Sequence, residues 1–168
     1  MAEEVVKKIK EILDELGLKY RYVDEDKLFV IPVTTEARKF NVLIMVRGDW
    51  ITTVALAAKK EELPKDLDER EFFRTLLRLS LELSEVTYGL TELGDVVVHA
   101  ETHVRALSKE NFKIELASVM FGVDYFAKEV ATKYPRVRVP DEVTRKIYYY
   151  IASVSYTHLR AHETEADL

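Results

Sequence analysis

The sequence contains no cysteine, and this absence excludes several classes of protein. Without a thiol there is no disulfide framework, no thiolate zinc site and no cysteine nucleophile, so neither a disulfide-stapled secreted mini-domain nor a zinc ribbon fits the chain. Long hydrophobic runs are also missing. The longest apolar stretches, such as Val42–Val46 and Ile51–Ala58, fall far short of the roughly 20 residues that cross a bilayer. We therefore expect a cytoplasmic protein with no membrane partner.

Amide side chains are scarce as well, because the chain has no Gln and its only Asn residues are Asn41 and Asn111. Depletion of these heat-labile residues beside abundant Lys and Glu is typical of hyperthermophile proteins and predicts a thermophilic source. A formal net charge of -5 argues against a protein that coats DNA. The length of 168 residues, with 48% hydrophobic residues, indicates one compact domain.

The hydrophobic pattern predicts an α+β fold: helix, antiparallel β-meander, helix, β-hairpin, long helix and an added C-terminal helix. Apolar residues at helical spacing predict the first helix over Glu3–Leu16, with Gly17 as its C-terminal glycine. The turn chemistry of Gly48-Asp49 predicts a hairpin between two apolar strands. The remaining expected elements are strands Tyr20–Val23, Lys27–Val33, Phe40–Arg47 and Trp50–Ala58, helix Glu69–Leu83, hairpin Val86–Leu90 with Asp95–Val104, a helix from Ser108 to before Pro135, and a helix from Asp141.

The last residues of the chain stand apart from the rest. The string that begins Val-Ser-Tyr-Thr-His-Leu-Arg at Val154 is similar to a translated sequencing adapter, which occurs at the ends of reading frames taken from metagenomic reads. We expect residues 1–153 to form a single α+β domain and residues 154–168 to be a non-native tail. His158 and His162 have the spacing of a zinc helix but lack the intervening glutamate, so we predict no metal site there.

One predicted strand carries the strongest candidates for chemistry. Asp95, His99, Glu101 and His103 alternate with apolar residues, so a strand places them on one face. Strand-borne His-x-His pairs bind zinc in some enzymes, and a small metal-dependent enzyme that uses this face is the alternative function, with His99, Glu101 and His103 as weak candidate ligands. The usual role of such a row is the polar side of an amphipathic strand. We expect no metal and no cofactor.

No recognised catalytic motif is present. The five glycines form neither a GxGxxG nor a Walker A loop, and there is no GxSxG elbow. We therefore predict a protein that is not an enzyme and has no catalytic residues. A basic cluster with interleaved tyrosines supplies too little phosphate neutralisation to make nucleic acid an expected partner. That cluster consists of Lys133, Arg136, Arg138, Arg145 and Lys146, with Tyr134 and Tyr148–Tyr150.

The order of the expected elements resembles the type III secretion chaperone-like fold, and in particular the bacterial sensory transduction regulator family. The resemblance covers about Glu4–Lys133 and lies in order and spacing, not in a signature motif. It implies an α+β homodimer that binds extended segments of other proteins and performs no catalysis. The added helix after Pro140 departs from the pattern of the family. The matching features are the first helix, strands Phe40–Arg47 and Trp50–Ala58, helix Phe72–Leu83, the turn Tyr88–Gly94 before Asp95–Val104, and the Ser108-capped helix.

The apolar residues exceed what one core contact needs. Val42–Val46 is apolar on both faces of its strand, and the helix Glu69–Leu83 carries more apolar residues than one face in contact with one core needs. A dimer interface or a peptide groove uses such a surplus, so we predict a non-catalytic, chaperone-like homodimer that binds a protein or peptide partner. The predicted contact residues are Phe72, Phe73, Leu76, Leu79, Ile114 and Phe121. The other interpretation is that Asp141–Ser153 folds back and covers the excess within one chain.

Overall fold

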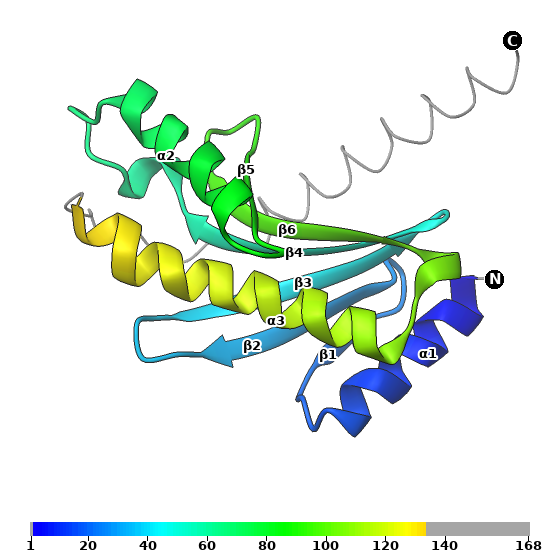
Figure 1. Cartoon of the computed structure of the whole chain (residues 1–168). Helices are drawn as coiled ribbons and strands as arrows, with labels where there is room; N and C mark the ends of the chain where they lie inside the picture. The colour runs from blue at the N-terminus through cyan, green and yellow to red at the C-terminus, as the bar shows by residue number, and fades with distance from the viewer. Residues whose placement is uncertain (1, 134–168) are drawn as a thin grey trace, which may run out of the picture.

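A computed structural model gives the structure of residues 2–133. Its centre is a six-stranded antiparallel sheet with the strand order β1-β2-β3-β4-β6-β5, and the helices lie against one face of this sheet (Figure 1). The α+β class and the order helix, meander, helix, hairpin, helix are confirmed. The helix expected from Asp141 and the expected tail 154–168 lie outside the described residues.

The strands follow the apolar runs of the sequence closely. Gly48, with φ +56, makes the two-residue turn that brings Arg47 opposite Trp50. The last hairpin then returns to the middle of the sheet, where Trp50 pairs with His103. The strands are β1 (Arg21–Val23), β2 (Leu28–Thr34), β3 (Lys39–Arg47), β4 (Trp50–Ala58), β5 (Thr87–Leu90) and β6 (Val96–His103).

Side-chain caps and a glycine fix the helix ends. α1 (Ala2–Glu15) ends before Gly17, whose φ of +68 suits a C-terminal glycine. The Asp68 carboxylate accepts from the Glu71 backbone N–H and starts α2 (Glu69–Glu82), and the Ser108 hydroxyl does the same for α3 (Lys109–Tyr125). Short 3₁₀ turns lie at Lys60–Glu62, Val104–Ala106 and Ala131–Lys133. None of the helices within residues 2–133 has the length and apolar character needed to cross a membrane.

The helix that follows Ser108 differs from its predicted form. It was expected to run to the residue before Pro135, but α3 ends at Tyr125 and continues as a π-helical turn, Phe126–Val130. The Phe126 N–H is shared between the carbonyls of Gly122 and Val123. The buried Tyr88 hydroxyl also donates to the Gly122 carbonyl, at 2.8 Å. This second hydrogen bond to the Gly122 carbonyl accompanies the widening of the helix, and the periodicity of the sequence does not predict it.

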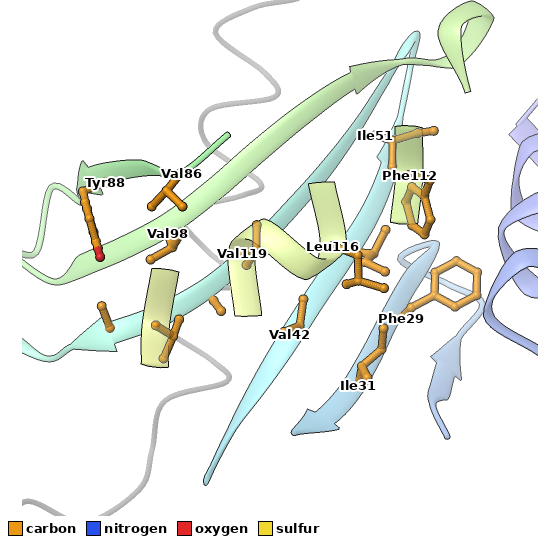
Figure 2. Packing of buried hydrophobic residues seen from close by; sticks show 14 of the residues in the cluster. Phe29, Ile31, Val42, Ile51, Val86, Tyr88, Val98, Phe112, Leu116 and Val119 are labelled. Carbon is orange, nitrogen blue, oxygen red and sulfur yellow. The ribbon is translucent and has the colours of Figure 1, made fainter. Parts of the chain in front are cut away.

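Apolar side chains are buried on both faces of the sheet. On the near face, which carries the helices, Phe112, Leu116 and Val119 of α3 point at strand residues such as Val42 and Val98 (Figure 2). Alternate residues of the same strands form a second cluster on the far face. The far face consists of Leu28, Val30, Leu43, Met45, Val54, Leu56 and Val97.

The Tyr88 hydroxyl gives the fold a testable dependence on alkaline pH. Burial raises the pKa of Tyr88 above its usual range. The unfolded chain releases the tyrosine proton near pH 10 while the folded chain keeps it, so stability is full below about pH 10 and falls above it. Urea unfolding of the wild type and of Tyr88→Phe from pH 8 to pH 11 checks this. The difference in the free energy of unfolding between the wild type and Tyr88→Phe should shrink above about pH 10. A difference that stays constant from about pH 8 to about pH 11 would contradict the burial of the Tyr88 hydroxyl.

Candidate functional site

Four large apolar side chains are exposed on the helices. On α2, Leu77 is 71% exposed and Leu81 is 87% exposed; on α3, Ile114 is 53% exposed and Phe121 is 52% exposed. Residues four or seven apart lie on one side of a helix, so each pair forms a stripe. We call these four residues the outer apolar surface. Exposed apolar stripes of this kind suit contact with another polypeptide.

The predicted contact residues of α2 divide between the core and the surface. Phe72 is 0% exposed and Leu76 is 6% exposed, so they offer no surface within this chain. The Phe72 ring lies 5.4 Å from Phe73 and 6.3 Å from Phe126 between ring centres, which attaches α2 to the end of α3. Phe73 and Leu79 are half-buried. Of the six predicted residues, Ile114 and Phe121 are the ones that lie on the surface.

The residues that sequence reasoning missed are Leu77 and Leu81. They belong to the same helix but are not among the predicted contact residues, because the apolar residues of α2 span more than one side and hide which side faces the sheet. A helical turn of about 3.6 residues sets Leu77 and Leu81 away from the stripe that contains Phe72 and Leu76. Grouping the residues of α2 by this spacing, with the more regular stripe assigned to the core, would have found them.

The polar row predicted on β6 loses one member. Asp95 precedes the strand and is buried, 3% exposed, with its carboxylate accepting from the Lys60 backbone N–H at 2.9 Å. Its own N–H donates to the Thr91 hydroxyl at 3.0 Å. Asp95 therefore joins the β5–β6 turn to the segment after β4. The prediction that Asp95 lies on one strand face with His99 and His103 is wrong, because Asp95 precedes β6 and its carboxylate is bound to Lys60.

The remaining polar residues of β6 engage neighbours singly. A ring nitrogen of His99 lies 2.8 Å from a Glu101 carboxylate oxygen. The His103 ring packs edge-on against Trp50 at 5.3 Å, and its Nδ1 accepts from the Arg105 N–H. Within residues 2–133 the structure places no three His, Cys, Asp or Glu side chains where they could hold a metal ion.

A polar notch opens at the edge of the sheet beside β6. β5 pairs with β6 only as far as Thr87 opposite His99, and no strand within residues 2–133 pairs with the same edge of Ala100–His103. A cavity of about 370 Å³ lies there. At its rim the Thr102 hydroxyl donates to the Glu115 carboxylate of α3. The cavity is lined by Ser80, Glu85, Val86, Thr87, His99, Ala100, Glu101 and Glu115.

Replacing Asp95 by alanine tests its structural role. The change removes the buried Asp95 carboxylate and leaves the Lys60 backbone N–H without its acceptor, so we expect the free energy of unfolding to fall by about 1–2 kcal/mol. Glu101→Ala is the control, because Glu101 is exposed and should change stability by less than about 0.5 kcal/mol. Urea denaturation of both variants makes the comparison. Equal losses would mean that Asp95 acts as a surface residue like its neighbours.

Solved structures match this fold, although no family model and no curated protein sequence matches the chain. YbjN from E. coli superposes with a TM-score of 0.58 at 15% sequence identity, covering 80% of this chain and 96% of YbjN. A chain of the ExsC–ExsE complex gives a TM-score of 0.57 at 17% identity, covering 77% of this chain and 96% of that one. A chain of the HopA1–SchA chaperone–effector complex gives 0.53 at 14% identity, covering 75% and 96%.

These likenesses concern architecture. At 14% to 17% identity they show that the chain has the type III secretion chaperone-like fold, shared with YbjN. The resemblance predicted from the order of the elements is therefore confirmed. The exposed stripes on α2 and α3 and the open edge of β6 are the features of this chain that a function has to explain.

Proposed function

We propose that this chain is a non-catalytic, chaperone-like protein-binding module that acts as a homodimer in the cytoplasm and holds an extended segment of a partner protein. The observation that carries the proposal is the outer apolar surface, where Leu77 and Leu81 are 71% and 87% exposed. The fold supports it, because one of the matching structures is a chaperone–effector complex. A helix side that contacts only water does not need leucine at these positions, whereas a side that binds another polypeptide does.

We assign the α2 stripe to the dimer. Leu77 and Leu81 lie one turn apart on a helix, and a two-fold axis would place the stripe of one copy against the same stripe of the other. Half-buried Phe73, one turn before Leu77 on the same side of α2, enlarges the contact. The buried pair Phe72 and Leu76 stays in the core of each copy and holds the helix in place.

We assign the partner segment to the open edge of β6. An extended segment added along Ala100–His103 would satisfy backbone groups that no described strand pairs on that side. Glu115 lines the notch at this edge, and its neighbour Ile114 begins the exposed stripe of α3. The part of the partner that pairs with β6 would find hydrogen bonds there, and a part that continues over the outer side of α3 would find apolar contact at Ile114 and Phe121.

The dimer is tested by charging its stripe. Leu77→Asp with Leu81→Asp should convert a dimer to a monomer in sedimentation equilibrium at micromolar concentration, because four carboxylates, two from each copy, would be desolvated in the contact. Arg74→Ala with Arg78→Ala is the matched control: it has the same spacing, the same helix and the same change in net charge, and should stay dimeric. A wild type that is monomeric across this range would show the dimer assignment to be wrong.

The partner assignment needs a separate experiment. Random peptides displayed on phage, selected on the immobilised wild type, should yield extended sequences with alternating apolar residues. Binding of the selected peptides should fall at least tenfold, about 1.4 kcal/mol, in Ile114→Asp with Phe121→Asp. Lys113→Asp, on an exposed position of the same helix, is the control. Selected peptides that bind the stripe variant and the wild type equally would place the partner elsewhere.

A further inference from the structure

The far face of the sheet is buried without help from any described helix. Its seven residues are between 0% and 7% exposed. The buried residues of α1, α2 and α3 all join the near-face cluster, whereas the far-face cluster contains strand residues only. Figure 1 shows the three helices on the same side of the sheet. An apolar sheet face of this size needs a cover.

We propose that the segment 141–153 of the same chain lies across the far face and covers it. The low exposures belong to a single copy of the chain, which favours a cover from that chain over a second copy or a separate peptide. The outer apolar surface, by contrast, is exposed in the same single copy. The two apolar surfaces therefore have different partners, and this proposal is independent of the proposed function.

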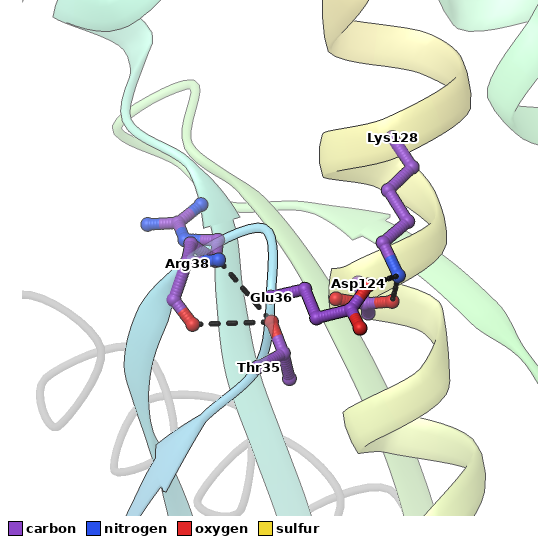
Figure 3. A network of polar contacts seen from close by, with 5 residues as sticks. All are labelled: Thr35, Glu36, Arg38, Asp124 and Lys128. Atoms are coloured by element: carbon purple, nitrogen blue, oxygen red, sulfur yellow. Dashed lines mark hydrogen bonds and ion pairs between the residues drawn. The ribbon is translucent and has the colours of Figure 1, made fainter.

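The described chain ends where such a crossing can begin. Lys128, near the end of the π-helical turn, forms ion pairs with Asp124 at 2.8 Å and with Glu36 of the β2–β3 turn at 3.6 Å (Figure 3). The bond to Lys128 lowers the pKa of Asp124, and the bond to Asp124 raises the pKa of Lys128, so both stay charged. These contacts hold the end of α3 beside an end of the sheet. A chain that leaves from there can pass around the sheet to its other face.

The reach and the length both suffice. Residues 134–140, fully extended, span up to about 24 Å, whereas layers packed on the two faces of a sheet, each about 10 Å from it, are about 20 Å apart. As a helix, 141–153 would be about 20 Å long. The far face runs from β2 across β3 and β4 to β6, three strand spacings of about 4.8 Å, or about 14 Å.

The sequence of the segment supplies a suitable apolar stripe. Val143, Ile147, Tyr150 and Ile151 are spaced for one side of a helix, and the intervening charged residues belong to the other side. This stripe is comparable in width to the far-face cluster. Residues 154–168, which resemble a translated adapter, are not needed for the contact.

The chain contains no cysteine, so introduced thiols report proximity without background. In the full chain, Val54→Cys with Ile147→Cys, treated with a short dimaleimide, should give a cross-linked monomer by mass spectrometry. A second pair, Val54→Cys with Tyr150→Cys, guards against an unfavourable register. Leu77→Cys with Ile147→Cys is the control, because Leu77 lies on α2 on the opposite side of the sheet, and should give no cross-link within a chain.

Each outcome decides the proposal. Cross-links within one chain for a Val54 pair, without one for the control, support it. Cross-links that join two chains would show that a second copy covers the far face, and equal reaction of all pairs, or none, would remove the segment from this face.

Hydrophobic dye binding adds a readout: Ile147→Asp with Ile151→Asp should raise the fluorescence of the dye several-fold, whereas Tyr148→Asp with Tyr149→Asp should not. These variants should remain dimeric, because the dimer is assigned to the α2 stripe and not to the far face. The far-face proposal can therefore fail without affecting the α2 assignment.

Discussion

Phe72→Ala is expected to lower the free energy of unfolding by about 3–5 kcal/mol, because it removes a fully buried aromatic ring. Phe72 is 0% exposed, and its ring contacts Phe73 on α2 and Phe126 at the end of α3. The change would leave a cavity between two helices and the sheet. Urea denaturation followed by circular dichroism measures the loss. A cost below about 1 kcal/mol would contradict the packing of α2.

Leu77→Ala is the matched comparison on the same helix. Leu77 is 71% exposed, so its loss removes little packing within one chain. If the α2 stripe forms a dimer, the stability lost in Leu77→Ala depends on protein concentration, because association stabilises the folded state by mass action. The additional loss caused by the Phe72 cavity should persist at every concentration. The pair therefore separates a core residue from a residue of the proposed interface.

Local chemistry made much of the fold predictable. The Gly48-Asp49 turn and the Ser108 cap lie where the sequence placed them, because each is decided by neighbouring residues. The apolar run in β3 was recognised as apolar on both sides, and both sides are buried. The order of these elements then sufficed for the type III secretion chaperone-like fold.

The candidate site was less predictable, because its residues depend on contacts between distant segments. Asp95 has the strand parity of His99, yet its hydrogen bond to Lys60, which lies far back in the sequence, takes it out of that row. Periodicity cannot report such a bond. On α2 the apolar residues extend from the core side to an exposed side, so the position of the sheet is needed to tell Phe72 from Leu77.

Gly122→Val is expected to cost about 3 kcal/mol, because a valine of β6 and one just before β5 leave no space for a side chain at this glycine. A Cβ at Gly122 would lie 2.7 Å from a methyl carbon of Val98 and 2.9 Å from one of Val86. Both valines are almost completely buried, at 0% and 1% exposed, so neither side chain has space to move. The intrinsic gain in helix propensity over glycine, less than about 1 kcal/mol, is too small to offset this overlap.

A double-mutant cycle with Val98→Ala tests whether the close approach is the cause. If Val98 is the obstacle, the double variant Gly122→Val with Val98→Ala should be more stable than the sum of the single changes by at least about 1 kcal/mol. Strict additivity would mean that the helix does not meet β6 at this position. The contact at Gly122 matters for the outer apolar surface, because Phe121, the residue before Gly122, belongs to that surface. The Gly122 carbonyl also accepts the hydrogen bond from the Tyr88 hydroxyl. A helix displaced at Gly122 would carry Phe121 with it, so weakened binding of selected peptides should accompany the loss of stability.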